Sequence, residues 1–262
     1  MKPLETADES SESLNTLLEI LTPLNIEMVV YEARLLKIDS VESLEQCVDV
    51  IFENAIENEC QELFAVLCTK LHWPCVQICK ESQRVVTFKE QVKATAQKEV
   101  EMFLERQTLT KGRKLNQKIE DKDVACSKKL RRPIALFRFI GHLYLIDFVP
   151  TILIKQCVLA HLDDAFCNEN SLETLCAMLK IAGKKFEISE HIDLTNEFRL
   201  LKARKKTTPT SPHTRFMIEE LLAMQINRWD AVNKVDYIML YNLFLGDVEE
   251  KLFVIELWQH RK

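Results

Sequence analysis

The chain has 262 residues, 47% of them hydrophobic, so it is long enough for one or two domains and apolar enough to bury a continuous core. This composition excludes a wholly disordered protein. Four glycines and seven prolines are too few for the turns that a sandwich, a barrel or another fold of many short strands requires. We therefore expect an all-α protein.

Charge is distributed unevenly along the chain. The formal net charge is −5, yet residues 1–62 hold 3 basic and 15 acidic side chains, whereas residues 63–218 hold 27 basic and 17 acidic ones. Local charge sets the field near a surface, so the two regions suit different partners. The middle region is the one that we expect to meet phosphate groups.

Apolar residues recur at helical spacing almost throughout, and alternation with period two is not sustained anywhere. The acidic residues 1–12 precede this pattern and are predicted to be disordered. Helices are predicted near residues 13–20, 23–36, 41–57, 60–72, 85–106, 129–147, 150–166, 171–183, 189–204, 213–228, 233–245 and 247–260.

Several helix starts can be read from local signals. Thr22-Pro23 predicts an N-cap followed by the first helical position, Asp39 or Ser40 predicts the next N-cap, and Pro150 opens another helix. The segment Asn170 to Glu173 has the spacing of a capping box.

Short connections between helices indicate a HEAT-like α-solenoid of about five helical hairpins over residues 13–229. Residues 106–128 are predicted to form a mobile basic connection inside this domain, and the Thr/Pro/Ser segment 205–212 cannot continue a helix. The periodic apolar residues of 230–262 predict an extra C-terminal hairpin that caps the stack.

The apolar stretch from Ile134 to Ile154 has the length of a membrane span but contains Arg138, Asp147 and Pro150. Each charge at the centre of a membrane span raises the free energy of insertion by about 2.5–3.5 kcal/mol, which exceeds the gain from several leucines together. We therefore expect a buried helix pair here and no membrane partner.

The sequence lacks the motifs of common enzymes. Its four glycines, at positions 112, 141, 183 and 246, cannot form a phosphate-binding loop, and neither a nucleophile elbow nor a zinc-protease motif is present. No enzyme activity and no cofactor are expected. Nine cysteines without a signal peptide suit a reducing compartment, the cytoplasm or the nucleus.

The sequence contains one candidate metal site. Cys68, His72, Cys75 and Cys79 are soft ligands at one-turn spacing, but they lack the tight C-x2-C turn of most zinc sites. Buried or partly exposed thiols are the favoured interpretation, with a zinc or redox site as the weaker alternative.

Two basic clusters are candidates for nonspecific RNA contact, because phosphate binding requires only such point charges. One consists of Lys128, Lys129, Arg131 and Arg132, and the other of Arg199, Lys202, Arg204, Lys205 and Lys206. Without interleaved aromatic residues for base stacking, a solvated helix face with favourable charge at a helix C-terminus is an equal alternative.

Seven segments resemble, in matching order, motifs of the middle domain of eukaryotic translation initiation factor 4G and its short paralogues. The run from Arg132 to Tyr144 resembles its "RRxxxxxxFIGELF" helix, and residues 18–26 (LEILTPLNI) resemble "LNxLTPxxF". The other segments are residues 44–55, 64–71, 88–100, 171–183 (SLETLCAMLKIAG) and 215–229 (RFMIEELLAMQINRW).

The resemblance implies five HEAT-like helix pairs in a non-enzymatic scaffold that binds the DEAD-box helicase initiation factor 4A, contacts RNA and meets other initiation factors. By motif match, the implied helicase-binding residues are Leu18, Leu21, Thr22, Pro23, Ile26, Arg215 and Trp229. Plain core packing is the alternative for the large apolar residues among them.

Departures from the motifs bear on partners. Ile26 replaces a phenylalanine, and His142 replaces a glutamate with a group that titrates near neutrality. The nearest match to a cap-binding-protein docking motif, Tyr31 to Leu36, is followed by Lys37, so no such docking is expected. The alternative function is a helical-repeat interaction module of another RNA pathway (silencing, splicing or decay) that does not bind the helicase.

Overall fold

A computed structural model describes residues 5–58, 60–71, 73, 76–77, 85–111, 123–163 and 167–229. Within these ranges the chain forms ten α-helices and very little other regular structure, which confirms the all-α prediction. The predicted C-terminal hairpin, residues 230–262, lies outside the described residues.

The helices occur at the following positions. The first five are α1 (Glu5–Glu19), α2 (Ile26–Leu35), α3 (Val41–Glu57), α4 (Gln61–Lys70) and α5 (Phe88–Lys111). The second five are α6 (Asp123–Leu145), α7 (Thr151–Leu162), α8 (Glu169–Lys184), α9 (Thr195–Thr207) and α10 (Pro212–Ile226). A π-helical turn, η1 (Lys185–Ser189), continues α8.

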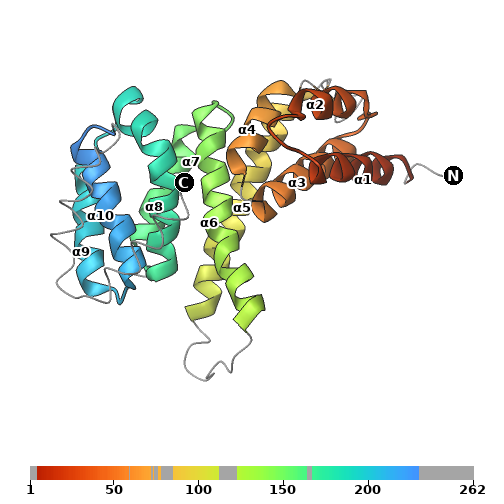
Figure 1. Cartoon of the computed structure of the whole chain (residues 1–262). Coiled ribbons are helices and arrows are strands. Elements are labelled where there is room, and N and C mark those ends of the chain that lie inside the picture. The colour runs from red at the N-terminus through yellow and green to blue at the C-terminus, as the bar shows by residue number, and fades with distance from the viewer. Residues whose placement is uncertain are drawn as a thin grey trace.

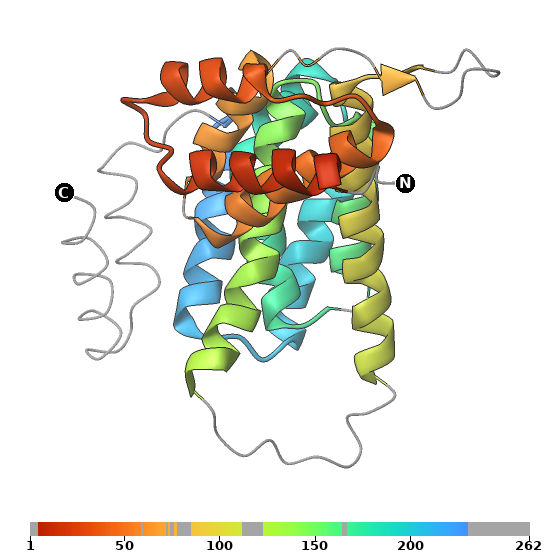
Figure 2. The same cartoon turned by 90° about the vertical axis from the view of Figure 1, so that its right-hand side faces the viewer.

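Successive helices run antiparallel and stack into an elongated α-solenoid (Figure 1). α1 packs on α3, α3 on α6, α6 on α8 and α8 on α10, while α5, α7 and α9 form a second row. The pair α1–α2 forms one end of the stack, as the view along the molecule shows (Figure 2). The described residues thus contain five helical pairs, the number that was predicted.

Side-chain caps fix the starts of several helices. Ser40 accepts a hydrogen bond from the backbone N–H of Ser43, which confirms the predicted N-cap of α3. Asn168 and Ser211 cap α8 and α10 in the same way. The predicted capping box at Asn170 was wrong by two residues, because Asn168 supplies the same chemistry one half-turn earlier.

The predicted N-cap Thr22 with Pro23 in the first turn was also wrong. α2 begins three residues later, at Ile26, with Asn25 as its N-cap residue. Residues 22–25 instead form a turn, because the Asn25 side chain bonds backward to the chain that precedes it.

Three further differences concern irregular segments. α1 begins at Glu5, so residues 5–12, predicted to be disordered, are helical. α5 and α6 extend to Lys111 and back to Asp123, so helices occupy part of the predicted mobile connection, and residues 112–122 lie outside the described part. A two-stranded antiparallel ladder pairs β1 (Val76–Gln77) with β2 (Val85–Val86), too short for a sequence period to detect.

The core runs continuously through the stack. Phe139, in the centre of α6, is fully buried and meets Phe52 of α3 edge-on at 5.1 Å between ring centroids. The segment predicted to be a buried helix pair is indeed α6 followed by α7, with Pro150 directly before α7. No described helix is long and apolar enough to cross a membrane.

Candidate functional site

The turn between α1 and α2 is held in one shape by Asn25. Its side-chain oxygen accepts a hydrogen bond from the backbone N–H of Thr22 at 2.7 Å, and its amide donates to the carbonyl of Ile20 at 2.6 Å. These two bonds close a loop around Pro23, whose fixed φ stiffens it further. Asn25 was not singled out from the sequence, although an Asn just before a helix is a recognisable turn signal.

The turn presents some of the predicted helicase-binding residues and hides others. Thr22 and Pro23 are exposed and Leu21 is half-buried, so these three can meet a partner. Leu18 and Ile26, on either side of the turn in sequence, are buried in the core and anchor the turn to it. The sequence prediction missed Leu24, whose side chain is 99% exposed at the tip of the same turn.

Trp229, predicted as a contact at the other end of the chain, is buried. Its indole N–H donates a 2.6 Å hydrogen bond to the Glu187 carboxylate, and Gln225 donates to the other oxygen of that carboxylate. The indole ring lies directly over Gly183 of α8. In this structure Trp229 joins the end of α10 to α8 and η1, and its ring is buried within the protein.

Arg215 differs from Trp229, because its side chain is exposed on the first turns of α10. Its Nε donates to the Thr210 hydroxyl at 3.3 Å. α10 and the α1–α2 turn lie at opposite ends of the solenoid (Figure 1). A single partner that contacts both must therefore span the length of the stack.

The first basic cluster contains both a paired and an exposed arginine. Arg132 makes a two-pronged hydrogen bond to Glu53 of α3, at 2.8 and 2.6 Å, which holds its guanidinium against the protein and raises its pKa above the ordinary value. Its assignment to RNA contact is therefore not supported by its position. Arg131 is exposed, and the side chains of Lys128 and Lys129, in the first turns of α6, lie outside the described residues.

The second cluster divides in the same way. Arg204 donates from Nε to the carbonyl of Leu162 at 3.1 Å, and Lys205 forms an ion pair with Glu219 of α10. Both basic groups lie in the last turn of α9, where they also suit the helix dipole. Lys206, like Arg199 and Lys202, is exposed.

The exposed parts of the two clusters lie on one edge of the stack. α6 begins, and α9 ends, at the lower edge in Figure 1, because successive helices alternate in direction. Arg131 lies in the N-terminal half of α6 and Lys206 in the last turn of α9, so both clusters lie toward this edge, which we call the basic edge. This basic edge is formed by residues 75 positions apart in sequence, and no local pattern could have united them.

Burial shifts the pKa values of two residues singled out from the sequence, His142 and Cys68. His142, expected to titrate near neutrality, is half-buried, and burial lowers its pKa from the ordinary value, so it is uncharged under neutral conditions. Cys68 is fully buried, and burial raises the pKa of its thiol to about 12.

The zinc alternative gains no support from the described residues. His72, Cys75 and Cys79 lie outside them, and within them no group of three or more His, Cys, Asp or Glu side chains could hold a metal ion. Cys68 itself is protonated and fills core space, as a small apolar side chain does.

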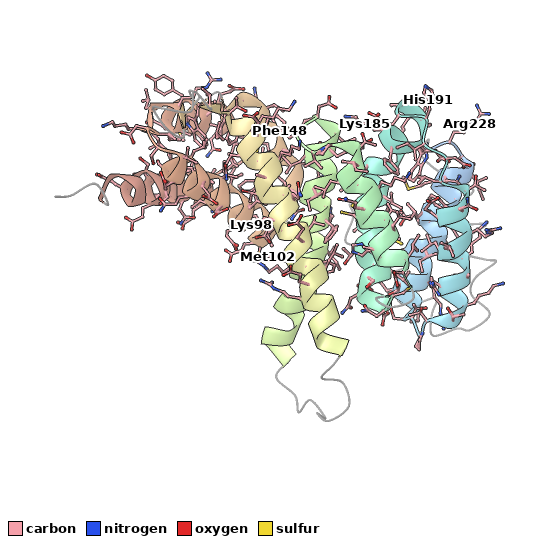
Figure 3. All side chains as sticks on the ribbon, turned by 180° about the vertical axis from the view of Figure 1, so that it is seen from behind. Lys98, Met102, Phe148, Lys185, His191 and Arg228 are labelled. Carbon is pink, nitrogen blue, oxygen red and sulfur yellow. The ribbon has the colours of Figure 1, made fainter. Side chains whose placement is uncertain are left out.

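The view from behind labels Lys185 at the upper end of the stack (Figure 3). Lys185 of η1 donates to the carbonyl of Tyr144 and pairs with Asp147, so it closes the C-terminal end of α6. The same turn anchors Trp229 through Glu187. η1 therefore ties α6 and α10 to the end of α8.

Comparison with known proteins finds similarity to translation initiation factors. The chain is 24% identical to mouse eukaryotic translation initiation factor 4 gamma 3 over 241 residues, and 26% identical to mouse eukaryotic translation initiation factor 4 gamma 1 over 233 residues. These alignments cover 84% and 82% of the chain. Melon eukaryotic translation initiation factor 4G is 22% identical over 242 residues, 90% of the chain.

The likeness concerns only a small part of those proteins, since the chain spans about 15% of the length of the mouse relatives. No protein-family model matches the chain. Over most of its own length, and at low identity, the chain is similar to one stretch of eukaryotic translation initiation factor 4 gamma, as its seven motifs predicted.

Proposed function

We propose that the chain is a non-enzymatic scaffold of translation initiation that binds the helicase initiation factor 4A and RNA in the cytoplasm. The observation that carries the proposal is the similarity to initiation factor 4 gamma proteins over 82–90% of the chain. The fold supports it, because a solenoid offers a long surface for partners.

The helicase contact rests on two exposed regions. The first is the turn with Leu21, Thr22 and Pro23, which Asn25 holds rigid, so that binding costs little ordering entropy. The second is the start of α10 with Arg215. Leu18 and Ile26 are buried next to the first region and shape it, whereas Trp229 is buried at the opposite end of α10 from Arg215.

A binding experiment tests this assignment. The purified chain should bind purified helicase and change its ATPase rate, and the double variant Thr22→Ala with Pro23→Ala should weaken binding roughly tenfold or more, because contacts at the centre of an interface dominate its energy. The control is Thr207→Ala with Pro209→Ala, which alters a second exposed Thr and Pro, at the end of α9 and just after it. It should bind normally.

Absence of both binding and an ATPase effect in the wild-type chain would refute the helicase proposal. Equal losses in the two double variants would refute the assignment to the α1–α2 turn while leaving the helicase proposal intact. Circular dichroism and thermal unfolding of each variant establish that the fold is retained.

The RNA contact rests on the basic edge. If Lys128, Lys129 and Arg131 contact phosphates, the association constant for RNA should fall as salt is added. A plot of its logarithm against the logarithm of the salt concentration should have a slope of about −0.7 per phosphate neutralised on single-stranded RNA. Replacing all three by Ala should flatten that slope by up to about 2. Arg132 is omitted, because its loss would break the pair with Glu53 and change stability as well.

Fluorescence anisotropy with an unstructured RNA at several salt concentrations measures the slope. The control replaces Lys89, Lys93 and Lys155, three exposed basic residues of α5 and α7, by Ala. An unchanged slope in the first variant, or the same flattening in the control, would show that these residues do not form a specific phosphate site.

A second candidate function is an interaction module of another RNA pathway, such as silencing, splicing or decay. It is favoured by one observation: three of the seven helicase-binding residues implied by the motifs, Leu18, Ile26 and Trp229, are buried. A chain that binds RNA but leaves the helicase unbound would support this second candidate.

A further inference from the structure

The outer surface of α2 carries a row of large apolar side chains that are exposed to solvent. Leu24, in the turn before the helix, is followed by Met28, Tyr31 and Leu35, and all four are exposed. The spacings of three and four residues place Met28, Tyr31 and Leu35 on one side of the helix, and Leu24 lies in the turn directly before it. The same spacing forms the seam of a two-helix coiled coil.

The position of α2 makes this row unusual. α1 and α2 form the terminal pair of the solenoid (Figure 2), and a terminal pair normally presents a polar outer face, because no further pair covers it. α1 follows this rule, since its exposed residues include Glu9, Glu12, Thr16 and Glu19. α2 does not, so its apolar row is suited to another helix.

The charges beside the apolar row indicate which helix could pack against it. Glu27 and Arg34 lie seven residues apart on one side of it, and Glu32 lies on the other side. If two α2 helices pair antiparallel, Glu27 of each copy faces Arg34 of the other, which gives two attractive contacts. If they pair parallel, Glu27 faces Glu32 of the other copy, which gives two repulsive ones.

Existing contacts leave both charges accessible. Lys70 of α4 pairs with Glu27 at 2.6 Å, and Arg34 donates to the Lys70 carbonyl, yet the Glu27 side chain remains 76% exposed and Arg34 is also exposed. Lys70 of α4 thus holds the Glu27 and Arg34 side chains beside the apolar row, where both remain accessible to a second chain.

We propose that two copies of the chain associate through α2, with the two helices antiparallel and the rows of Leu24, Met28, Tyr31 and Leu35 in contact. This association extends the solenoid end to end and does not depend on helicase or RNA binding. The contact is formed mainly by one ten-residue helix from each copy, so its area lies at the low end for specific interfaces, and the dimer is weak.

Sedimentation equilibrium of the full chain over a wide concentration range tests the proposal. The mass should rise with concentration from 30.6 kDa toward twice that value. Salt near 0.15 M limits repulsion between the acidic N-terminal regions of the two copies, since it shortens the screening length to about 8 Å. A constant monomer mass up to the highest concentration would overturn the proposal.

Substitutions identify the surface. Tyr31→Ser should weaken association roughly a hundredfold, because both copies lose a large apolar contact worth about tenfold each. The matched control is Ile152→Ser on α7, since Ile152 is 61% exposed and Tyr31 is 62% exposed. The control should associate normally. Equal effects in both variants, or none in Tyr31→Ser, would overturn the proposal.

A charge exchange tests the antiparallel register. Glu27→Arg alone and Arg34→Glu alone should each weaken the dimer, because each places like charges together. The double variant should restore it. If the double variant is weaker than both single variants, the proposed register is wrong.

Discussion

Gly183→Ala should destabilise the protein by about 2–4 kcal/mol. A Cβ at this position would lie 2.1 Å from the Trp229 ring, closer than real Cβ atoms approach other heavy atoms. Overpacking costs about 1–3 kcal/mol, and displacing the indole also strains its hydrogen bond to the Glu187 carboxylate, a bond type worth about 1.5–3 kcal/mol. The higher helix propensity of alanine offsets this destabilisation by only about 0.5–1 kcal/mol.

Urea unfolding of wild type and variants measures this effect. Gly141→Ala is the matched control, because Gly141 also lies inside a helix but its Cβ would meet Ile181 at 3.3 Å, an approach that a small shift relieves. It should change stability by less than about 1 kcal/mol.

A double-mutant cycle assigns the effect to the indole. After Trp229→Ala, Gly183→Ala should no longer destabilise, so the two changes should be strongly non-additive. Full additivity would show that the cost of the alanine arises elsewhere in α8. The same cycle tests whether Trp229 is a structural residue, as its burial indicates.

His161 should make the protein lose stability in mild acid. The imidazole is buried between Phe103 and Phe137, and its Nδ1 donates to the Cys157 carbonyl at 2.7 Å, while Nε2 has no hydrogen-bond partner among the described atoms. Burial lowers its pKa from 6.5 to about 4, an effect that the hydrogen bond to Cys157 opposes only in part.

The direction of the pH effect follows from proton binding. Between pH 6.5 and about 4 the unfolded chain binds a proton at His161 and the folded chain does not, so stability falls as the pH is lowered through this window. The loss approaches about 3 kcal/mol at the lower end and is absent above pH 7.

The comparison of wild type with His161→Phe isolates this contribution, since carboxylates titrate alike in both proteins. The difference in unfolding free energy should change by about 3 kcal/mol between pH 7 and pH 4. His191→Asn, at an exposed position whose positive φ asparagine tolerates, is the control and should show no such change. Parallel pH curves for wild type and His161→Phe would contradict the prediction.

Periodicity and short-range chemistry in the sequence were enough for the main features of the fold. Apolar residues three and four positions apart define helices, and signals such as Ser40 before α3 act within one turn of the chain, so both can be read without a structure. The order of seven motifs likewise predicted the similarity to initiation factor 4 gamma.

Local signals failed where two chemically equivalent candidates stood close together. Asn25 rather than Thr22 precedes α2, and Asn168 rather than Asn170 caps α8. The choice depends on where the helix meets the core, since Ile26 and Leu172 must point inward. That orientation is a tertiary property.

Only the tertiary structure decided which basic and aromatic side chains remain available to partners. Arg132 pairs with Glu53, 79 residues away in sequence, and Trp229 reaches Glu187 across 42 residues, so neither partner can be read from spacing. Likewise, the sequence contains the row from Leu24 to Leu35 but does not tell whether it is covered. Helical periodicity depends on neighbours along the chain, whereas exposure depends on which distant helix packs against each face.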